Sequence, residues 1–189
     1  MRIISGKYKG LHLLEPDRNR TRPTSDKVRQ AVFNILEHAV LDGGFHELSI
    51  LDAFAGSGAL GLEALSRGAK KCLFVEKSAK VARVLIENIK AIVHHGDEVA
   101  VQAVCQDVTK IKINQYFDLV FLDPPFKKTD LYLNVMLNLK QQGAVDSKTV
   151  FYVESSEKLD YVLRDAGMPI REISSRQFGN VVISFWCLV

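Results

Sequence analysis

The stretch ILDAFAGSGALG, residues 50–61, decides the fold of this chain. An apolar run ends in the carboxylate of Asp52, a glycine loop follows, and the residues from Ala59 onward are typical of a helix. A strand that leads through a glycine turn into a helix directs backbone N–H groups at a ligand above the strand end. Gly56 and Gly58 allow a tight bend and a close ligand approach, because neither carries a Cβ atom.

The glycine spacing also matches a known fingerprint. Gly56-x-Gly58-x-x-Gly61 has the pattern of dinucleotide-binding loops, and Glu76 follows at about the distance of a ribose-binding acid. A glycine turn without a ligand is the alternative that the glycines alone would leave open. With Asp52 before the loop and Glu76 after it, the pattern indicates a nucleoside-containing cofactor at the carboxyl end of this strand.

Size and composition favour a single globular domain with a small appendage. The chain has 189 residues, of which 47% are hydrophobic and 25% charged. No apolar run approaches the length of a membrane span, and the first residues are too short for a signal peptide, so we expect a cytoplasmic protein. The cysteines and five histidines lack ligand spacing, so we expect no metal site and buried thiols at Cys72, Cys105 and Cys187.

The positive charge is concentrated at the N-terminus. Residues 1–29 hold eight Arg or Lys and three Asp or Glu, a net charge of +5, whereas the rest of the chain carries −2. A basic segment on a near-neutral body predicts a phosphate-bearing partner. A solvated surface without a partner is the alternative that charge alone leaves open.

Hydrophobic periodicity predicts the order of the elements. Residues 2–5 and 11–14 indicate two short strands around a glycine-rich turn, and residues 26–41 an amphipathic helix. Strands and helices then alternate, with strands at 48–54, 72–76, 99–104, 116–122 and 150–153, and helices at 59–67, 79–93, 130–140 and 157–166. A final hairpin joins 170–178 to 181–189. The pattern predicts a doubly wound, mostly parallel α/β sheet with an antiparallel edge.

A second motif, Asp123-Pro124-Pro125-Phe126, follows the strand at 116–122. The two prolines end the strand and stiffen the loop. In a doubly wound sheet this loop lies at the same edge as the glycine loop. The Asp123 carboxylate and the Pro124 carbonyl can accept the N–H bonds of a planar amine, and Phe126 can stack on its ring. A rigid turn with a capping Asp is the alternative for the tetrapeptide taken alone.

These motifs carry a resemblance that spans the chain. In order and spacing, Asp52-x-Phe54-x-Gly56-x-Gly58, Glu76, Asp107 and the Asp123 tetrapeptide resemble class I S-adenosylmethionine-dependent methyltransferases that modify exocyclic amines. Further signatures make the whole chain similar to the bacterial 16S ribosomal RNA guanine-N2 methyltransferase family: Arg2-Ile3-Ile4-Ser5-Gly6, Thr21-Arg22-Pro23-Thr24, Asp26-x-Val28-Arg29 and Phe178-Gly179-Asn180. Ser5 stands where that family often has glycine.

The resemblance implies a seven-stranded, Rossmann-like sheet with a small N-terminal β-hairpin. It divides the chain into an RNA-contacting extension, residues 1–24, and a methyltransferase domain, residues 25–189. The implied cofactor is S-adenosyl-L-methionine. Its expected contacts are Gly56, Ser57 and Gly58 for the methionine part, Asp52 for the amino group, Glu76 for the ribose hydroxyls, Asp107 and Val108 for the adenine, and Arg22 and Thr24 near the carboxylate.

The resemblance also implies an RNA substrate, either 16S rRNA or the small ribosomal subunit, including an assembly intermediate. The amine of a guanine would meet Asp123, Pro124 and Phe126, with either Asp123 or water taking its proton. The expected RNA contacts are Lys7, Lys9, Arg18, Arg20 and Phe126. We expect the enzyme to act as a monomer.

Other functions share parts of this pattern. A nicotinamide-dependent dehydrogenase uses the same glycine fingerprint, but gives no reason for the Asp123 tetrapeptide. Methyltransferases of DNA adenine N6 or of a protein glutamine amide use related tetrapeptides, commonly with Asn first. A non-catalytic RNA-binding module could keep the fold. Glu76 and Asp107 could also merely cap the helices that follow them.

Overall fold

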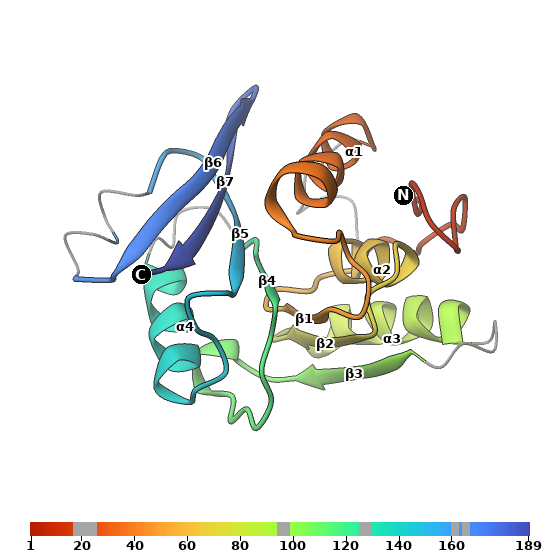
Figure 1. The fold of residues 1–189 in the computed structure, drawn as a ribbon. Coiled ribbons are helices and arrows are strands. Elements are labelled where there is room, and N and C mark those ends of the chain that lie inside the picture. The colour runs from red at the N-terminus through yellow and green to blue at the C-terminus, as the bar shows by residue number, and fades with distance from the viewer. Residues whose placement is uncertain (17–25, 94–98, 125–129, 160–162, 164–166) are drawn as a thin grey trace.

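The computed structural model describes residues 1–16, 26–93, 99–124, 130–159, 163 and 167–189. A seven-stranded sheet in the order β3-β2-β1-β4-β5-β7-β6 forms its centre (Figure 1). The strands are β1 (Ser49–Asp52), β2 (Lys71–Glu76), β3 (Ala100–Cys105), β4 (Leu119–Leu122), β5 (Val150–Ser155), β6 (Ile170–Phe178) and β7 (Val181–Leu188). The predicted seven-stranded α/β sheet is confirmed.

The strand directions give the sheet a parallel body and an antiparallel edge. Strands β1 to β5 pair in parallel, whereas β7 pairs antiparallel with both β5 and β6. From β1 the chain moves to β2 and β3 on one side, and β4 and β5 continue on the other. The topology therefore changes direction between β1 and β4, and α/β sheets bind ligands beyond the strand ends at such a point.

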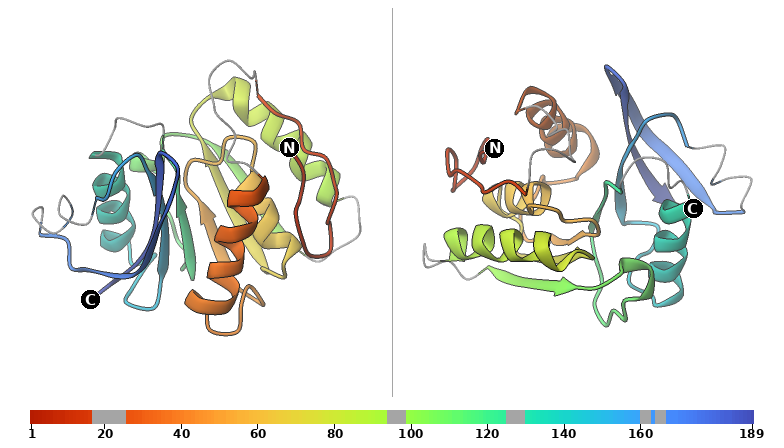
Figure 2. Two further views of the ribbon diagram at one scale, coloured as in Figure 1. Left: turned by 90° about the horizontal axis from the view of Figure 1, so that it is seen from above. Right: turned by 180° about the vertical axis from the view of Figure 1, so that it is seen from behind.

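Helices cover both faces of the sheet (Figures 1 and 2). They are α1 (Asp26–Ile35), the π-helical turn η1 (Leu36–Val40), α2 (Ala59–Ser66), α3 (Ala79–Val93), the 3-10 turn η2 (Val108–Lys110) and α4 (Asp130–Gln141). One hydrophobic cluster joins α1, α2 and α3 to one face, and a second joins α4 to the other. The predicted helix over 157–166 lies mostly outside the described residues.

The predicted helix over 26–41 changes its winding before it ends. It is α-helical only to Ile35, and the Leu41 N–H then donates to the Leu36 carbonyl at 2.8 Å, five residues back. Such π turns are short insertions at the ends or in the middle of α-helices. On this helix Val32, Phe33 and Leu36 are nevertheless buried in the core.

Residues 1–16, which we call the N-terminal segment, fold back on themselves with less strand structure than predicted. Arg2 and His12 form an isolated bridge in place of two strands. The Ile3 N–H donates to the Leu11 carbonyl at 2.9 Å, but the N–H groups of Ile4 and Ser5 donate to helix α2 instead. Donors used in this way cannot extend a strand ladder.

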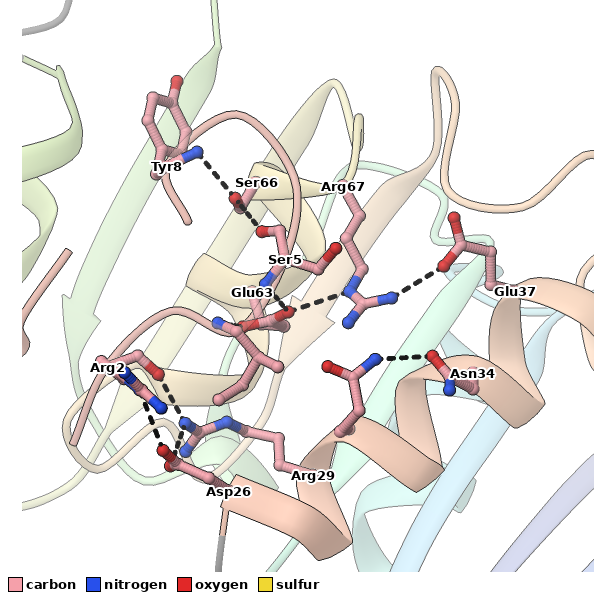
Figure 3. A network of polar contacts seen from close by, with 12 residues as sticks. Arg2, Ser5, Tyr8, Asp26, Arg29, Asn34, Glu37, Glu63, Ser66 and Arg67 are labelled. Carbon is pink, nitrogen blue, oxygen red and sulfur yellow. Dashed lines mark hydrogen bonds and ion pairs between the residues drawn. The ribbon is translucent and has the colours of Figure 1, made fainter. Parts of the chain in front are cut away.

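A buried polar network fastens this segment to α2 (Figure 3). Glu63 accepts hydrogen bonds from the Ile4 N–H at 2.7 Å and from the Ser5 N–H at 3.0 Å. One turn further, the Ser66 hydroxyl donates to the Ser5 carbonyl and accepts from the Tyr8 N–H. Gly6 is required here, since a Cβ atom at this position would lie 1.8 Å from the Ser66 carbonyl oxygen.

Arg67 extends the network to the first helix. Its Nε donates to Glu63 at 2.9 Å, its Nη1 donates to Glu37 at 2.7 Å, and its guanidinium lies 5.1 Å from the centre of the Phe33 ring. Arg29 on α1 donates to the Arg2 carbonyl and to Asp26. Helices α1 and α2 and the N-terminal segment therefore form one polar-linked unit.

The cysteines differ from the prediction at one position. Cys72 and Cys187 are buried, as expected, but Cys105 is exposed on the edge strand β3. The prediction was wrong for Cys105, because an apolar-looking strand at a sheet edge leaves many of its side chains in solvent. Among the described residues, no helix is long and apolar enough to cross a bilayer.

Candidate active site

The predicted acids follow four neighbouring parallel strands at one edge of the sheet (Figure 1). Asp52 ends β1 and Glu76 ends β2, whereas Asp107 follows β3 and Asp123 follows β4. Asp52 lies opposite Phe121 in the β1–β4 register, so the glycine loop and the Asp123 loop leave the sheet side by side. The structure therefore brings the two motifs together, as the sequence predicted.

Asp52 fixes the start of α2. Its Oδ2 accepts the Gly61 N–H at 3.0 Å, and its side chain is only 2% exposed. Burial raises the pKa of this carboxyl to about 7, with a smaller contribution from Glu76, while the Gly61 hydrogen bond acts in the opposite direction. A contact between Asp52 and a cofactor amino group remains a prediction; the contact with α2 was not predicted.

The three glycines of the fingerprint serve different purposes. A Cβ atom on Gly58 would lie 2.6 Å from Leu85 Cδ1, and one on Gly61 would lie 2.3 Å from the Phe74 ring. Both glycines therefore face protein. Gly56 alone opens outward, since a Cβ atom there would meet nothing nearer than the Phe54 carbonyl oxygen at 4.0 Å. At Gly58 the missing Cβ atom therefore makes room for Leu85. A contact between the cofactor and the backbone of Gly58 remains a prediction.

Glu76 bridges the glycine loop and the next helix. Its Oε2 accepts the Gly56 N–H at 3.0 Å, and its Oε1 accepts the Ser78 N–H at 2.7 Å. The predicted ribose acceptor thus touches the one glycine that opens outward. A carboxylate oxygen can accept a second hydrogen bond, so these contacts leave Glu76 able to bind hydroxyl groups.

Asp107 already has a structural task. It caps η2 through the Thr109 N–H at 3.1 Å and the Thr109 hydroxyl at 2.8 Å, and Lys77 Nζ lies 2.7 Å from its Oδ2. The Lys77 hydrogen bond, followed by that of Thr109, lowers the pKa of Asp107 to about 2. Asp107 therefore does cap the turn that follows it, which was the alternative to a cofactor contact. A contact of Asp107 or of the buried Val108 with adenine remains a prediction.

The Asp123 carboxyl is partly buried beside other acids. Burial, then Glu154 and Asp52, hold its pKa well above the ordinary range. Pro124, the next residue, is buried, and the contact of its carbonyl with the amine remains a prediction. The second proline of the tetrapeptide and Phe126 lie outside the described residues, so the predicted stacking of Phe126 stays a prediction.

Glu154 is a buried acid that acts on Asp123 and that the sequence analysis did not single out. It lies on β5, is 4% exposed, and accepts the Tyr152 hydroxyl at 2.6 Å, while its backbone carbonyl accepts the Tyr132 hydroxyl at 2.6 Å. A signal was present, because Glu154 follows the apolar run 150–153 in the same way that Asp52 and Glu76 follow theirs.

Asn88 on α3 joins the glycine loop to the N-terminal segment. Its Nδ2 donates to the Ser57 carbonyl at 2.8 Å and to the Leu14 carbonyl at 3.0 Å, and its Oδ1 accepts the Leu14 N–H at 2.7 Å. Ser57 itself is almost fully buried. Asn88 therefore binds the backbone carbonyl of Ser57 and not its side chain.

The predicted RNA-binding residues are separated from this edge or fall outside the described chain. The Lys7 N–H donates to the carbonyl of Ser66, at the end of α2 opposite the glycine loop, and Lys9 follows on the same exposed turn. An eight-residue helix spans roughly 12 Å, so these lysines stand away from the strand ends. The predicted RNA contacts Arg18 and Arg20 lie outside the described residues, as do the predicted cofactor contacts Arg22 and Thr24.

The geometry suits a reaction at the carboxyl ends of the parallel strands. Among the described residues, no group of three or more His, Cys, Asp or Glu side chains could hold a metal ion. An outward-opening glycine loop with an acid beside it lies next to a loop that presents a carboxyl of raised pKa. Titratable groups with perturbed pKa values at such an edge are typical of catalytic sites.

Comparisons with known proteins identify the family of this chain. Residues 1–187 match the sequence model of the family described as Conserved hypothetical protein 95. The ribosomal RNA small subunit methyltransferase D of Escherichia coli K12 is 37% identical over 155 residues, which cover 82% of this chain and 74% of that protein. The protein of the same name from Buchnera aphidicola (strain Bp) is 32% identical over 167 residues, covering 86% and 80%.

A solved structure shows the same fold over the full length. The candidate methyltransferase yhhF of Escherichia coli superimposes with a TM-score of 0.78 at 30% identity, covering 100% of this chain and 97% of the other. At the level of the family, the methyltransferase resemblance predicted from the motifs is confirmed.

Proposed function

We propose that this chain, which belongs to the family described as Conserved hypothetical protein 95, transfers a methyl group from S-adenosylmethionine to the exocyclic N2 amine of a guanine in small-subunit rRNA. The observation that carries the proposal is the pairing of β1 with β4, which puts the Gly56 loop and Asp123 at the same edge. Relatives named as small-subunit rRNA methyltransferases support the substrate class.

The residues at this edge fit an adenosyl sulfonium donor. The open side of Gly56 leaves room for a ligand against the backbone, and Glu76 offers carboxylate oxygens beside it for ribose hydroxyls. Helix α2 begins just after Gly58. The partial positive charge at its N-terminus would favour the carboxylate of the cofactor's methionine part. When bound, S-adenosylmethionine supplies an electrophilic methyl group.

Asp123 and the Pro124 carbonyl would bind the guanine amine that takes the methyl group. A guanine amine is a weak nucleophile, because its lone pair is delocalised into the ring. Two acceptors for its N–H bonds favour a pyramidal nitrogen whose lone pair faces the methyl group. Holding both reactants in this geometry contributes several kcal/mol, up to about 7–11 in favourable cases. Extruding the base from its stack costs a few kcal/mol.

The N-terminal segment and the basic stretch that follows it would contact RNA. Backbone phosphate contacts position an enzyme without reading bases. The division into an RNA-contacting extension, residues 1–24, and a methyltransferase domain, residues 25–189, is part of this proposal, as are a monomeric state and a cytoplasmic location.

Two assays test the proposal against its alternatives. Thermal stabilisation by S-adenosylmethionine but not by NAD separates a methyltransferase from a dehydrogenase. Methyl transfer to small-subunit particles, naked 16S rRNA, DNA and protein, with mapping of the modified nucleotide, separates the acceptors. A chain that binds rRNA but transfers no methyl group to any of them would be the non-catalytic module.

A further inference from the structure

Glu154 lies near the carboxyl end of β5, a strand that is not followed by any of the predicted motifs. In the β4–β5 register Phe121 lies opposite Tyr152, and in the β1–β4 register it lies opposite Asp52. Side chains two residues apart on a strand share a face. Glu154 therefore shares the face of Tyr152, and Asp123, two residues after Phe121, lies next to it at the strand ends.

Contacts hold the Glu154 carboxylate in this place. The Tyr152 hydroxyl donates to its Oε2 at 2.6 Å, and the Tyr152 ring packs edge-on against Phe121 at 5.5 Å between centroids. From the other face of the sheet, the Tyr132 hydroxyl fixes the Glu154 backbone at 2.6 Å. A buried carboxylate fastened at both its side chain and its backbone has little freedom to move away from Asp123.

We propose that Glu154 is a positioning residue for the transfer reaction: held by Tyr152, its carboxylate makes Asp123 a stronger acceptor for the amine proton. This inference rests on the proposed function. In the step itself, the nitrogen lone pair forms the N–C bond, and the C–S bond breaks with its electrons on sulfur. The amine proton passes to the Asp123 carboxylate and then to water.

The physical basis is repulsion between buried like charges. Among the described residues, the ionisable groups that act on Asp123 or share its surroundings are Glu154 and Tyr152 on β5, Asp52 on β1 and Tyr132 on α4. A proton on Asp123 relieves its repulsion with an ionised Glu154, so the neighbour raises the proton affinity of Asp123. A stronger base accepts a proton more readily in the transition state.

The test compares pH profiles of single-turnover methyl transfer to small subunits for the wild type and Glu154→Gln. The glutamine keeps the size of the side chain and an oxygen for Tyr152, but removes the charge. We expect activity in the wild type to rise with pH as Asp123 loses its proton. In Glu154→Gln this rise should move to lower pH by about one unit or more, with a lower plateau rate.

Two further variants make the result specific. Tyr152→Phe removes the hydrogen bond that favours ionised Glu154, so the rise should shift in the same direction by a smaller amount, and this variant serves if Glu154→Gln fails to fold. Ser155→Ala is the matched control, since Ser155 is the next residue on β5, is equally buried and bonds the Glu157 carbonyl. Its profile should match that of the wild type. Superimposable profiles for all four proteins would overturn the inference.

A second measurement separates this inference from the proposed function. Carbon-13 NMR of the carboxyl groups, with the Asp123 signal assigned by Asp123→Asn, follows its titration in the free protein without any substrate. The apparent midpoint should be lower in Glu154→Gln than in the wild type. A wild type without transfer activity would contradict the proposed function, whereas an unchanged NMR midpoint would overturn the inference even in an active enzyme.

Discussion

Glu63 and Glu154 are both glutamates with almost no exposed surface, but their surroundings differ in charge. Glu63 pairs with Arg67 and accepts two backbone N–H groups of the N-terminal segment. Glu154 accepts a tyrosine hydroxyl and lies beside Asp123, whose pKa it raises. A buried acid compensated by a cation and by donors stabilises the fold, whereas a buried acid placed beside another acid changes its chemistry.

Replacing Asp123 tests the functional half of this comparison and should have the largest effect. Asp123→Ala removes the acceptor for the amine, so we expect a loss of about 10²–10⁴-fold in single-turnover rate. S-adenosylmethionine affinity, measured by calorimetry, should stay close to that of the wild type. Because the change removes a partly buried acid that other acids repel, the free energy of unfolding should stay equal or increase. Near wild-type turnover would show that Asp123 is not the acceptor.

Replacing Glu63 tests the structural half. Glu63→Ala leaves the buried Arg67 and two N–H groups without their acceptor, so we expect a loss of about 3–5 kcal/mol in the free energy of unfolding, measured in urea. Glu37→Ala is the matched control, because Glu37 is also a partner of Arg67 but its own side chain is 34% exposed. The control should lose about 1 kcal/mol or less. Equal losses in the two variants would contradict the account of Glu63.

The glycine loop allows a similar contrast between packing and binding. Gly58→Ala brings a Cβ atom against Leu85 at a φ of 84°, so we expect it to lose about 1–3 kcal/mol of stability. Gly56→Ala meets open space at a φ of 54°, so it should lose less stability but more S-adenosylmethionine affinity. Thermal melts with and without the cofactor measure both. A binding defect confined to Gly58→Ala would contradict the assignment of cofactor binding to Gly56 and of packing to Gly58.

The last prediction concerns the pH dependence of stability. The pKa of Asp52 is raised from 3.8 to about 7 in the folded protein, so folded Asp52 binds a proton that the unfolded chain releases between these values. Its contribution to stability is therefore present below pH 4 and lost as pH rises toward 7, by at most about 1.4 kcal/mol per pH unit. Asp52→Asn should flatten this part of the urea-derived stability profile. An unchanged slope would place the proton elsewhere.

The sequence predicted the site edge because strand and acid are adjacent in the chain. Each apolar run that ends in an acid specifies locally both the strand and the position of its carboxylate, as at Asp52 and Glu76. The parallel order then puts these ends together. The same apolar runs predicted all seven strands. The errors are a few residues at the strand ends, such as 48–54 for the observed Ser49–Asp52.

The features that were missed depend on partners far away in the chain. Glu63 looked like an ordinary helix residue, since its partners Ile4 and Ser5 precede it by 59 and 58 residues. Glu154 acquires its meaning only when β5 pairs with β4. The inward face of Gly58 depends on Leu85 of the next helix. The partners of Glu63 and Gly58 leave no pattern in the neighbouring sequence, and for Glu154 the only local signal is the apolar run before it.

Mapped methyl transfer tests the central claim most directly. Small subunits that lack the modification are incubated with the protein and labelled S-adenosylmethionine, and the label is located by nuclease digestion and mass spectrometry. The account predicts a single N2-methylguanine in 16S rRNA with the wild type and none with Asp123→Ala. Label on another base, on DNA or on protein, or equal labelling by the two proteins, would contradict it.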